Sequence, residues 1–185
     1  MRTIGYHHGD LRRTIQAAAI EAITESGPNG WSLRELARRA GVSHAAPAHH
    51  FGDKAGLLTA IAVEGFTLLA EEVQAAGPDF LEAGLAYIRF AVAHPAHFAV
   101  MFTPGLYRVD DPEVDAARTR ANNLLQQGAQ SLTPSGTDPR HLATAGWSIA
   151  HGFASLWLSG ALSAEEDDDP AGRARPALRL LVEDR

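Results

Sequence analysis

Cysteine is absent from the 185-residue sequence, and so is any apolar segment near its start. Without cysteine the chain can form neither disulfide bonds nor thiolate metal sites. The first 16 residues, MRTIGYHHGDLRRTIQ, hold no hydrophobic core of the kind that a secretory signal needs. Both absences agree with a protein of the cytoplasm, which is where we expect it to reside.

Strand-like patterns are lacking as well, because no alternation of apolar and polar residues reaches the length of a strand. Apolar residues instead recur at helical spacing between stretches rich in Gly and Pro. We therefore predict an all-α fold, and a chain of this length can bury a sizeable core. The predicted helices cover residues 9–26, 33–40, 44–50, 54–76, 79–94, 96–102, 112–130, 138–162 and 170–183.

One stretch lacks charge altogether: residues 142–164, LATAGWSIAHGFASLWLSGALSA, contain no Asp, Glu, Lys or Arg. Its length could span a bilayer. Its serines, glycines and histidine, and the charged residues that flank it, favour a buried helix instead, so we expect no membrane association. We expect this helix to form a homodimer interface in which small residues let two copies approach, namely Ala143, Gly146, Ala150 and Ala154.

The charge is unevenly distributed along the chain. The net charge is −6 overall, which argues against attraction of the whole protein to DNA. Residues 1–54, however, carry seven Lys or Arg against five Asp or Glu, together with five histidines, whereas residues 55–185 carry nine against seventeen. A basic head on an acidic body is typical of a protein that binds nucleic acid with one end.

Residues 32–54, SLRELARRAGVSHAAPAHHFGDK, have the local signals of two short helices joined by a turn. Ser32 followed by Glu35 is a capping-box pattern that starts the first helix. Gly41 stands where a helix-ending glycine is expected. Ser43 is placed to cap the second helix, and Pro47 falls in the first turn of that helix, where its missing N–H matters least. This helix-turn-helix arrangement inserts its second helix into the major groove of DNA.

The segment SLRELARRAGVSHAAPAHHFGDKAGLL resembles the DNA-binding segment of tetracycline-repressor (TetR) family regulators. Their pattern is Thr/Ser-x-x-x-Ile/Leu-Ala-x-x-Ala-Gly-Val-Ser, then a short helix, then His-Phe-x-x-Lys. The matching positions are Ser32, Leu36, Ala37, Ala40, Gly41, Val42, Ser43, His50, Phe51 and Lys54. The segment GWSIAHGFASLW also resembles the Trp…His-Gly stretch of one subgroup's C-terminal ligand domain. Two positions depart from the usual pattern: Ala48, where the family often has an aromatic residue, and Pro47.

The resemblance implies a helix-turn-helix DNA-binding domain over residues 1–54 and a helical effector-binding and dimerisation domain over residues 55–185. Ser32 and Ser43 would open helices whose N–H groups face phosphates. His50 and Lys54 would contact the sugar-phosphate backbone, which fixes the register on double-stranded operator DNA. The exposed positions of the third helix would read bases, namely His44, Ala45, Ala46 and His49.

For the larger domain, the resemblance implies a small-molecule effector and the pairing of two subunits. Apolar and aromatic residues on its helices would bind a mostly apolar ligand, with Tyr107, His151 and Ser155 as polar anchors. The same residues could instead only fill the core. The predicted ligand-binding residues are Phe66, Leu69, Leu85, Ile88, Met101, Phe102, Tyr107, Trp147 and His151.

The histidines do not have the spacing of a metal site. His44 and His49 are five residues apart, whereas helical ligand pairs need three or four. His94 and His97 have that spacing, but Pro95 lies between them at a predicted helix break. No nucleophile elbow, P-loop or dinucleotide fingerprint occurs, so we expect no metal, no cofactor and no catalytic residue.

We therefore predict a homodimeric transcription regulator, a repressor that a small effector releases from an inverted-repeat operator. Two other classes remain as alternatives. A helical-bundle enzyme would turn over a substrate, and an architectural DNA-binding protein would bind DNA without sequence preference and with a steep salt dependence.

Overall fold

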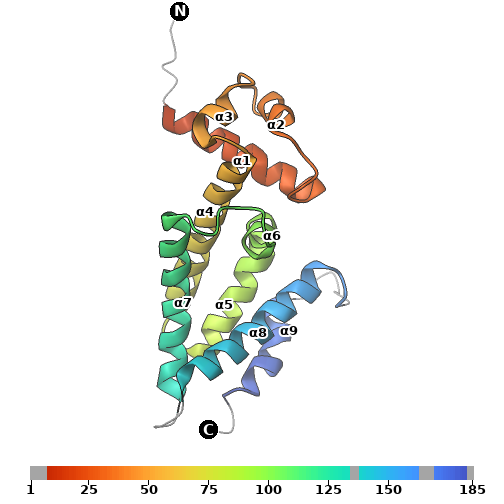
Figure 1. Cartoon of the computed structure of the whole chain (residues 1–185). Helices are drawn as coiled ribbons and strands as arrows, with labels where there is room; N and C mark the ends of the chain where they lie inside the picture. Colours follow the sequence, from red (N-terminus) through yellow and green to blue (C-terminus); the bar gives the residue numbers. More distant parts are fainter. Residues whose placement is uncertain (1–7, 134–137, 163–168, 183–185) are drawn as a thin grey trace, which may run out of the picture. The chain divides into compact units, whose positions relative to one another are not determined.

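A computed structural model describes residues 8–133, 138–162 and 169–182, and within these ranges all regular structure is helical. The predicted helices are all present, with ends that differ by a few residues at most (Figure 1). Their bounds are α1 His8–Ser26, α2 Leu33–Arg39, α3 Ala46–Phe51, α4 Lys54–Ala75, α5 Phe80–Ala93, α6 Pro95–Phe102, α7 Pro112–Leu132, α8 Pro139–Leu158 and α9 Pro170–Arg179.

The chain packs as two compact units, and each is described by itself. Unit 1 comprises residues 1–65 and 96–114, and unit 2 comprises residues 66–95 and 115–185. The division falls inside α4, after Gly65, and the segment that contains α6 joins the N-terminal helices in unit 1. The division into two units reflects only which residues pack together. The predicted functional boundary between residues 54 and 55 therefore stays a prediction.

The core of unit 1 forms where α1 packs against α2 and α3. Helix α1 buries its apolar face: Ile15, Ala19 and Ala22 have no exposed surface. Leu36 of α2 and Leu57 of α4 are equally buried. Burial of each large aliphatic side chain contributes about 1.5–3 kcal/mol, so this cluster holds the short α2 and α3, which are too short to be stable alone.

Helix α2 begins and ends as the sequence predicts. The Ser32 side chain accepts a hydrogen bond from the Glu35 backbone N–H at 3.3 Å. At the other end Gly41 has φ +65°, and the backbone N–H groups of Gly41 and Val42 donate to the carbonyls of Arg38 and Ala37. This is a Schellman ending, in which a glycine is favoured because its left-handed conformation is strained for other residues.

The start of α3 differs from the prediction. The helix begins at Ala46, its N-cap is Ala45, and no side chain caps it. Ser43 instead lies in the preceding turn, where its carbonyl accepts from the backbone N–H of Ala46 at 3.0 Å. The predicted side-chain cap at Ser43 is therefore wrong, because the turn after Gly41 occupies two more residues than expected. Pro47 does lie in the first turn, as predicted.

In unit 2, α5 packs against α8 and α9, and α8 packs against α9. Glycines permit these close approaches: a Cβ atom at Gly84 of α5 would lie 3.1 Å from Leu178 Cδ1 of α9. Helix α9 starts at an Asp169 cap, whose carboxylate accepts from the N–H groups of Ala171 and Gly172. Pro176 lies inside α9 and does not delay its start.

The small-residue face of α8 is covered by the protein's own chain. Ala143, Gly146, Ala150 and Ala154 are all buried in the isolated subunit. The phenyl ring of Phe80, at the start of α5, occupies the space where a Gly146 side chain would lie. The prediction that these four residues form the contact between two copies of the chain is therefore wrong. The exposed side chains of this helix lie elsewhere and include Trp147, Leu156 and Leu158.

In the described part of the chain, no single helix is long and apolar enough to cross a membrane. Helices α5 and α6, which are bent by 105° relative to each other, reach the length and composition of a membrane span only when they are counted together.

Candidate DNA-binding surface and ligand-binding residues

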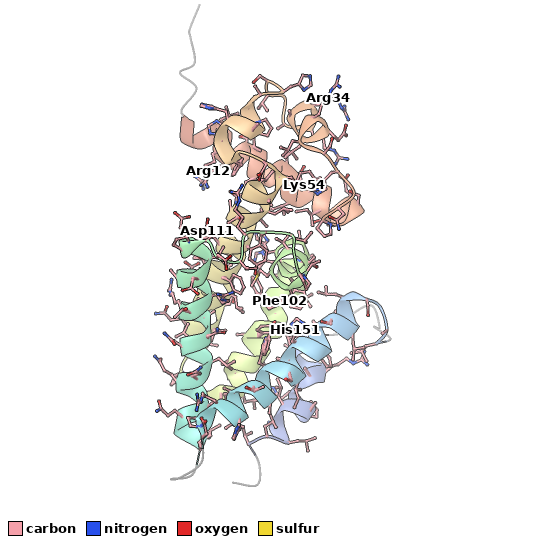
Figure 2. All side chains as sticks on the ribbon, in the orientation of Figure 1. Arg12, Arg34, Lys54, Phe102, Asp111 and His151 are labelled. Atoms are coloured by element: carbon pink, nitrogen blue, oxygen red, sulfur yellow. The ribbon has the colours of Figure 1, made fainter. Side chains whose placement is uncertain are left out.

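The predicted DNA-contacting residues lie in and around α2 and α3 of unit 1, and most are exposed. A hollow in this surface is bordered by Ser32, Arg34, Glu35, Arg38 and His44. Hydroxyl, guanidinium and imidazole groups from α2 and from the turn before α3 therefore reach the same surface (Figure 2 labels Arg34). Such groups are hydrogen-bond partners for phosphates and base edges.

The predicted base-reading residues are not all accessible. His44, Ala45 and His49 are exposed. Ala46 is only 8% exposed and belongs to the core of unit 1, so its predicted exposure is wrong. The reason is the late start of α3, which turns this residue toward the interior. His50 is half-buried, with its ring centroid 5.3 Å from that of His49.

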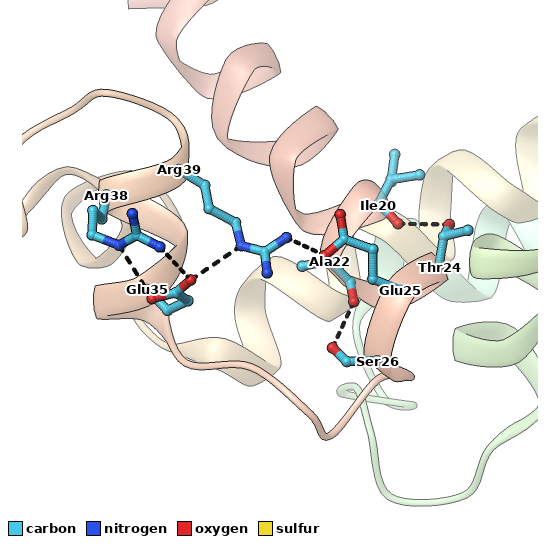
Figure 3. Close-up of polar contacts among 8 residues, drawn as sticks. All are labelled: Ile20, Ala22, Thr24, Glu25, Ser26, Glu35, Arg38 and Arg39. Carbon is cyan, nitrogen blue, oxygen red and sulfur yellow. Dashed lines mark hydrogen bonds and ion pairs between the residues drawn. The ribbon is translucent and has the colours of Figure 1, made fainter.

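The arginines of α2 differ in how firmly they are held (Figure 3). Glu35 accepts hydrogen bonds from Arg38 at 2.8 Å and from Arg39 at 3.2 Å, and Arg39 also pairs with Glu25 of α1. These hydrogen bonds, first from Arg38 and then from Arg39, lower the pKa of Glu35. The Glu35 carboxylate is thus engaged with arginines, so only the Ser32 half of the capping box forms. The Arg38 side chain remains 70% exposed.

Lys54 does not extend freely into solvent. Its ammonium donates to the Trp31 carbonyl at 2.9 Å and lies 4.2 Å from the centroid of the Trp31 ring. Burial lowers the pKa of Lys54. The side chain assigned by sequence to a phosphate contact thus has an intramolecular partner.

Two polar connections attach the segment 96–114 to the N-terminal helices within unit 1. Asp53, just before α4, pairs with Arg108, whose Nη2 lies 2.9 Å from both carboxylate oxygens. The Gly56 backbone N–H and, after it, Arg108 lower the pKa of Asp53. Glu64 of α4 accepts from Gln16 of α1 at 2.6 Å and lies 3.1 Å from His97 Nε2 of α6.

The predicted ligand-binding residues are distributed over both units. Phe66, Leu69, Leu85 and Ile88 are buried in unit 2. Met101, Phe102 and Tyr107 belong to unit 1, where the Tyr107 hydroxyl donates to the Met101 carbonyl at 3.2 Å. Trp147 and His151 lie on α8 in unit 2, where Trp147 is 42% exposed and His151 is half-buried. The set is therefore not one cluster within a single unit.

Sequence reasoning missed Tyr87 of α5, which joins Trp147 and His151 in one hydrogen-bonded group. Its hydroxyl lies 2.8 Å from His151 Nδ1 and accepts from Trp147 Nε1 at 3.3 Å. Burial raises the pKa of Tyr87 and lowers that of His151, so both groups are neutral near pH 7. A hydroxyl among the buried apolar residues of α5 was the available signal, because a buried tyrosine hydroxyl requires a partner.

Metal-binding geometry is not found in the described ranges, since no group of three His, Cys, Asp or Glu side chains gathers there. His94, one of the two histidines with helical spacing, is the C-cap of α5, and its ring packs against that of Phe90 at 5.5 Å. The other, His97, faces Glu64.

Known proteins resemble the chain over most of its length. Residues 15–61 match the profile described as "Bacterial regulatory proteins, tetR family", and residues 80–181 match "Tetracyclin repressor-like, C-terminal domain". The HTH-type transcriptional regulator BetI of Escherichia coli O157:H7 is 32% identical, and the similarity covers 86% of each protein.

Solved structures show the same fold. A protein of unknown function from Rhodococcus sp. RHA1 is 30% identical, with a TM-score of 0.78 over 98% of each chain. FadR from Bacillus subtilis, solved in complex with stearoyl-CoA, has a TM-score of 0.70 and 17% identity over 92% of this chain and 97% of its own. The enzyme and architectural alternatives find no support among these relatives. The protein belongs to the TetR family and is a DNA-binding transcription regulator.

Proposed function

We propose that the protein is a homodimeric repressor that binds an inverted-repeat operator and is released from it by a small, mostly apolar effector. The DNA-binding part of this proposal is supported by the hollow that Ser32, Arg34, Arg38 and His44 border. It gathers donors from both halves of the helix-turn-helix on one surface. His44, Ala45 and His49 read bases, while Ser32, Ser43 and His50 contact the backbone.

The effector-binding residues are proposed to be the predicted ones that lie in unit 2, together with Tyr87 of the Tyr87–Trp147–His151 group. Phe66, Leu69, Leu85 and Ile88 supply apolar surface, and the hydrogen-bonded group supplies polar anchors. FadR, which has the same fold, was solved in complex with stearoyl-CoA, a ligand with an apolar acyl chain, and this supports an effector with apolar character. Met101, Phe102 and Tyr107 belong to unit 1 and are left out of this set.

The dimer is proposed to form on α8, through the side chains that its own chain leaves uncovered. Trp147, Leu156 and Leu158 are 42%, 49% and 38% exposed. At about 100° per residue, Trp147 and Leu158 share one side of α8 and Leu156 lies on the opposite side, so a partner has to cover both flanks of the helix. A second copy of α8, together with the last helix beside it, covers both flanks with two-fold symmetry and places two heads on half-sites about 34–36 Å apart.

Enrichment of duplexes from a random-sequence pool by the purified protein tests the proposal. An inverted repeat with half-sites one helical turn apart is the expected product. Recovery of DNA without any sequence preference would contradict it and would favour the architectural alternative.

A further inference from the structure

Lysine occurs once in this sequence, at position 54, against fifteen arginines. Positive charge is thus supplied by arginine everywhere else, including the exposed Arg34 and Arg38 on the proposed DNA-binding surface. Arginine is the residue that suits bidentate recognition of phosphate, whereas lysine is a compact point charge on a flexible stem. Position 54 is therefore the one place in the sequence where a compact ammonium supplies the positive charge.

Among the described residues, the Lys54 ammonium makes its contacts with Trp31. It donates to the Trp31 carbonyl at 2.9 Å, and it lies over the indole ring at 4.2 Å from the centroid. A cation over the face of a tryptophan is attracted by the ring quadrupole, more strongly when it is partly removed from water. The adjacent carboxylate, Asp53, is directed to Arg108 and to the Gly56 N–H. The two contacts with Trp31 thus orient the lysine side chain toward the loop before α2.

Trp31 is itself fixed in the core. It is 8% exposed and packs with Leu36 and Leu57 among the residues of the unit 1 cluster. Its indole N–H is buried and has no hydrogen-bond partner among the described residues, which is unfavourable by itself. The contacts with Lys54 involve the Trp31 carbonyl and ring face, so they hold Trp31 through groups other than this N–H. Ser32, which caps α2, follows Trp31 directly, so the position of Trp31 fixes the start of the helix that borders the proposed DNA-binding surface.

We propose that Lys54 is a positioning residue, which holds Trp31 and the start of α2 in place for DNA binding and does not itself bind a phosphate. The inference rests on the proposed function and assigns to Lys54 a role different from the phosphate contact that the sequence suggested. The lowered pKa of Lys54 agrees with an ammonium partly withdrawn from water.

The two roles predict different salt dependences. A lysine that neutralises a phosphate releases a counterion, so its removal lowers the slope of log affinity against log salt by about one. A positioning lysine changes affinity at every salt concentration by the same factor and leaves the slope unaltered. The probe is the duplex that the wild-type protein enriches from a random pool, titrated between about 50 and 200 mM salt.

For Lys54→Met we expect about a tenfold loss of affinity with an unchanged slope. Arg34→Met removes one exposed cation from the same surface and serves as the matched comparison, for which the slope should fall. A slope that falls by about one in Lys54→Met would overturn the proposal. If the wild-type protein enriches no sequence, the proposed function is wrong. The role of Lys54 is then tested by the second measurement alone.

The second measurement is made first on the wild-type protein, so its main result does not depend on whether a variant folds. Lysine labelled with ¹⁵N and ¹³C gives one set of side-chain signals, because the chain has one lysine. We expect the ε-methylene protons to be shifted upfield by the Trp31 ring current, and Trp31→Leu to abolish the shift. The shift should persist when DNA binds. Absence of the shift in the free protein, or its loss on the addition of DNA, would show that the contact with Trp31 is not the functional role of Lys54.

Discussion

The hydroxyl of Tyr87 on α5 lies 2.8 Å from Nδ1 of His151 on α8, and it also accepts the indole N–H of Trp147. Because the tyrosine oxygen accepts from Trp147, its own proton is available to Nδ1 of His151. This arrangement favours the neutral imidazole. Burial lowers the pKa of His151 from its ordinary 6.5, in the same direction. A neutral, partly buried imidazole is thus built into the contact between two helices of unit 2.

The first prediction concerns pH. The pKa of His151 is lower in the folded protein than its ordinary value of 6.5. At pH values between these two pKa values, the folded protein binds fewer protons at His151 than the unfolded chain does. The contribution of His151 to stability is therefore fully present above about pH 6.5 and is lost as the pH falls from there through the lowered pKa of the folded protein. The thermal unfolding midpoint should decrease between about pH 7.5 and about pH 5.5, and this decrease should be larger for the wild type than for His151→Gln. Equal decreases in the two proteins would show that His151 does not titrate differently on folding.

The second prediction concerns the ends of α2. Ser32→Ala removes the acceptor for the Glu35 N–H and should lower the free energy of unfolding by about 0.5–2 kcal/mol. Gly41→Ala puts a Cβ on a residue with φ +65° and should cost about 1–2 kcal/mol. Gly41→Asn is the control, because asparagine tolerates this conformation better than alanine does. Denaturant unfolding measures all three, and a Gly41→Ala protein as stable as the Gly41→Asn protein would contradict the conformational explanation.

The helix ends of this protein were largely predictable because their signals are local. Ser32 and Gly41 act within a few residues of themselves, and each does in the structure what its sequence position indicates. The exception is Ser43, where the length of the turn after Gly41 decided which residue begins α3. That shift also buried Ala46, so a displacement of two residues changed one member of the predicted base-reading set.

Contacts between distant residues could not be predicted in the same way. Tyr87 meets Trp147 and His151 across sixty or more positions of sequence, and only the packing of α5 against α8 brings them together. The small face of α8 was recognised, but the sequence does not say which neighbour covers it. Phe80, which packs against Gly146, proved to be that neighbour. The motif likewise marked Lys54 without revealing Trp31 as its partner.

The third prediction concerns base reading. His44→Ala and His49→Ala should each change which duplexes are preferred, with a loss of about 1–3 kcal/mol at the affected base pair. His44 borders the hollow and His49 lies on α3, and both side chains are exposed. The substitutions should therefore leave stability nearly unchanged. Arg89→Ala, an exposed cation of α5 in unit 2, is the control and should leave the preference intact. Enrichment profiles that are identical for all three variants and the wild type would remove the histidines from base reading.

The fourth prediction separates the outer face of α8 from its inner face. Leu156 is 49% exposed, whereas Ala150 is 1% exposed and covered by its own chain. Leu156→Glu should therefore fold but sediment as a monomer, because a carboxylate would lie unpaired between the two copies. Ala150→Glu should instead destabilise the subunit itself, since the buried charge lies within one chain.

Sedimentation velocity at micromolar concentration, combined with denaturant unfolding, distinguishes these two effects. Gln126→Glu places the same charge on an exposed position of α7 and should stay dimeric and stable. Monomeric Leu156→Glu should also bind the inverted repeat much more weakly than the wild type, because two linked heads gain from effective concentration and one head does not. A Leu156→Glu protein that remains dimeric and keeps its operator affinity would place the subunit interface elsewhere than on the exposed face of α8.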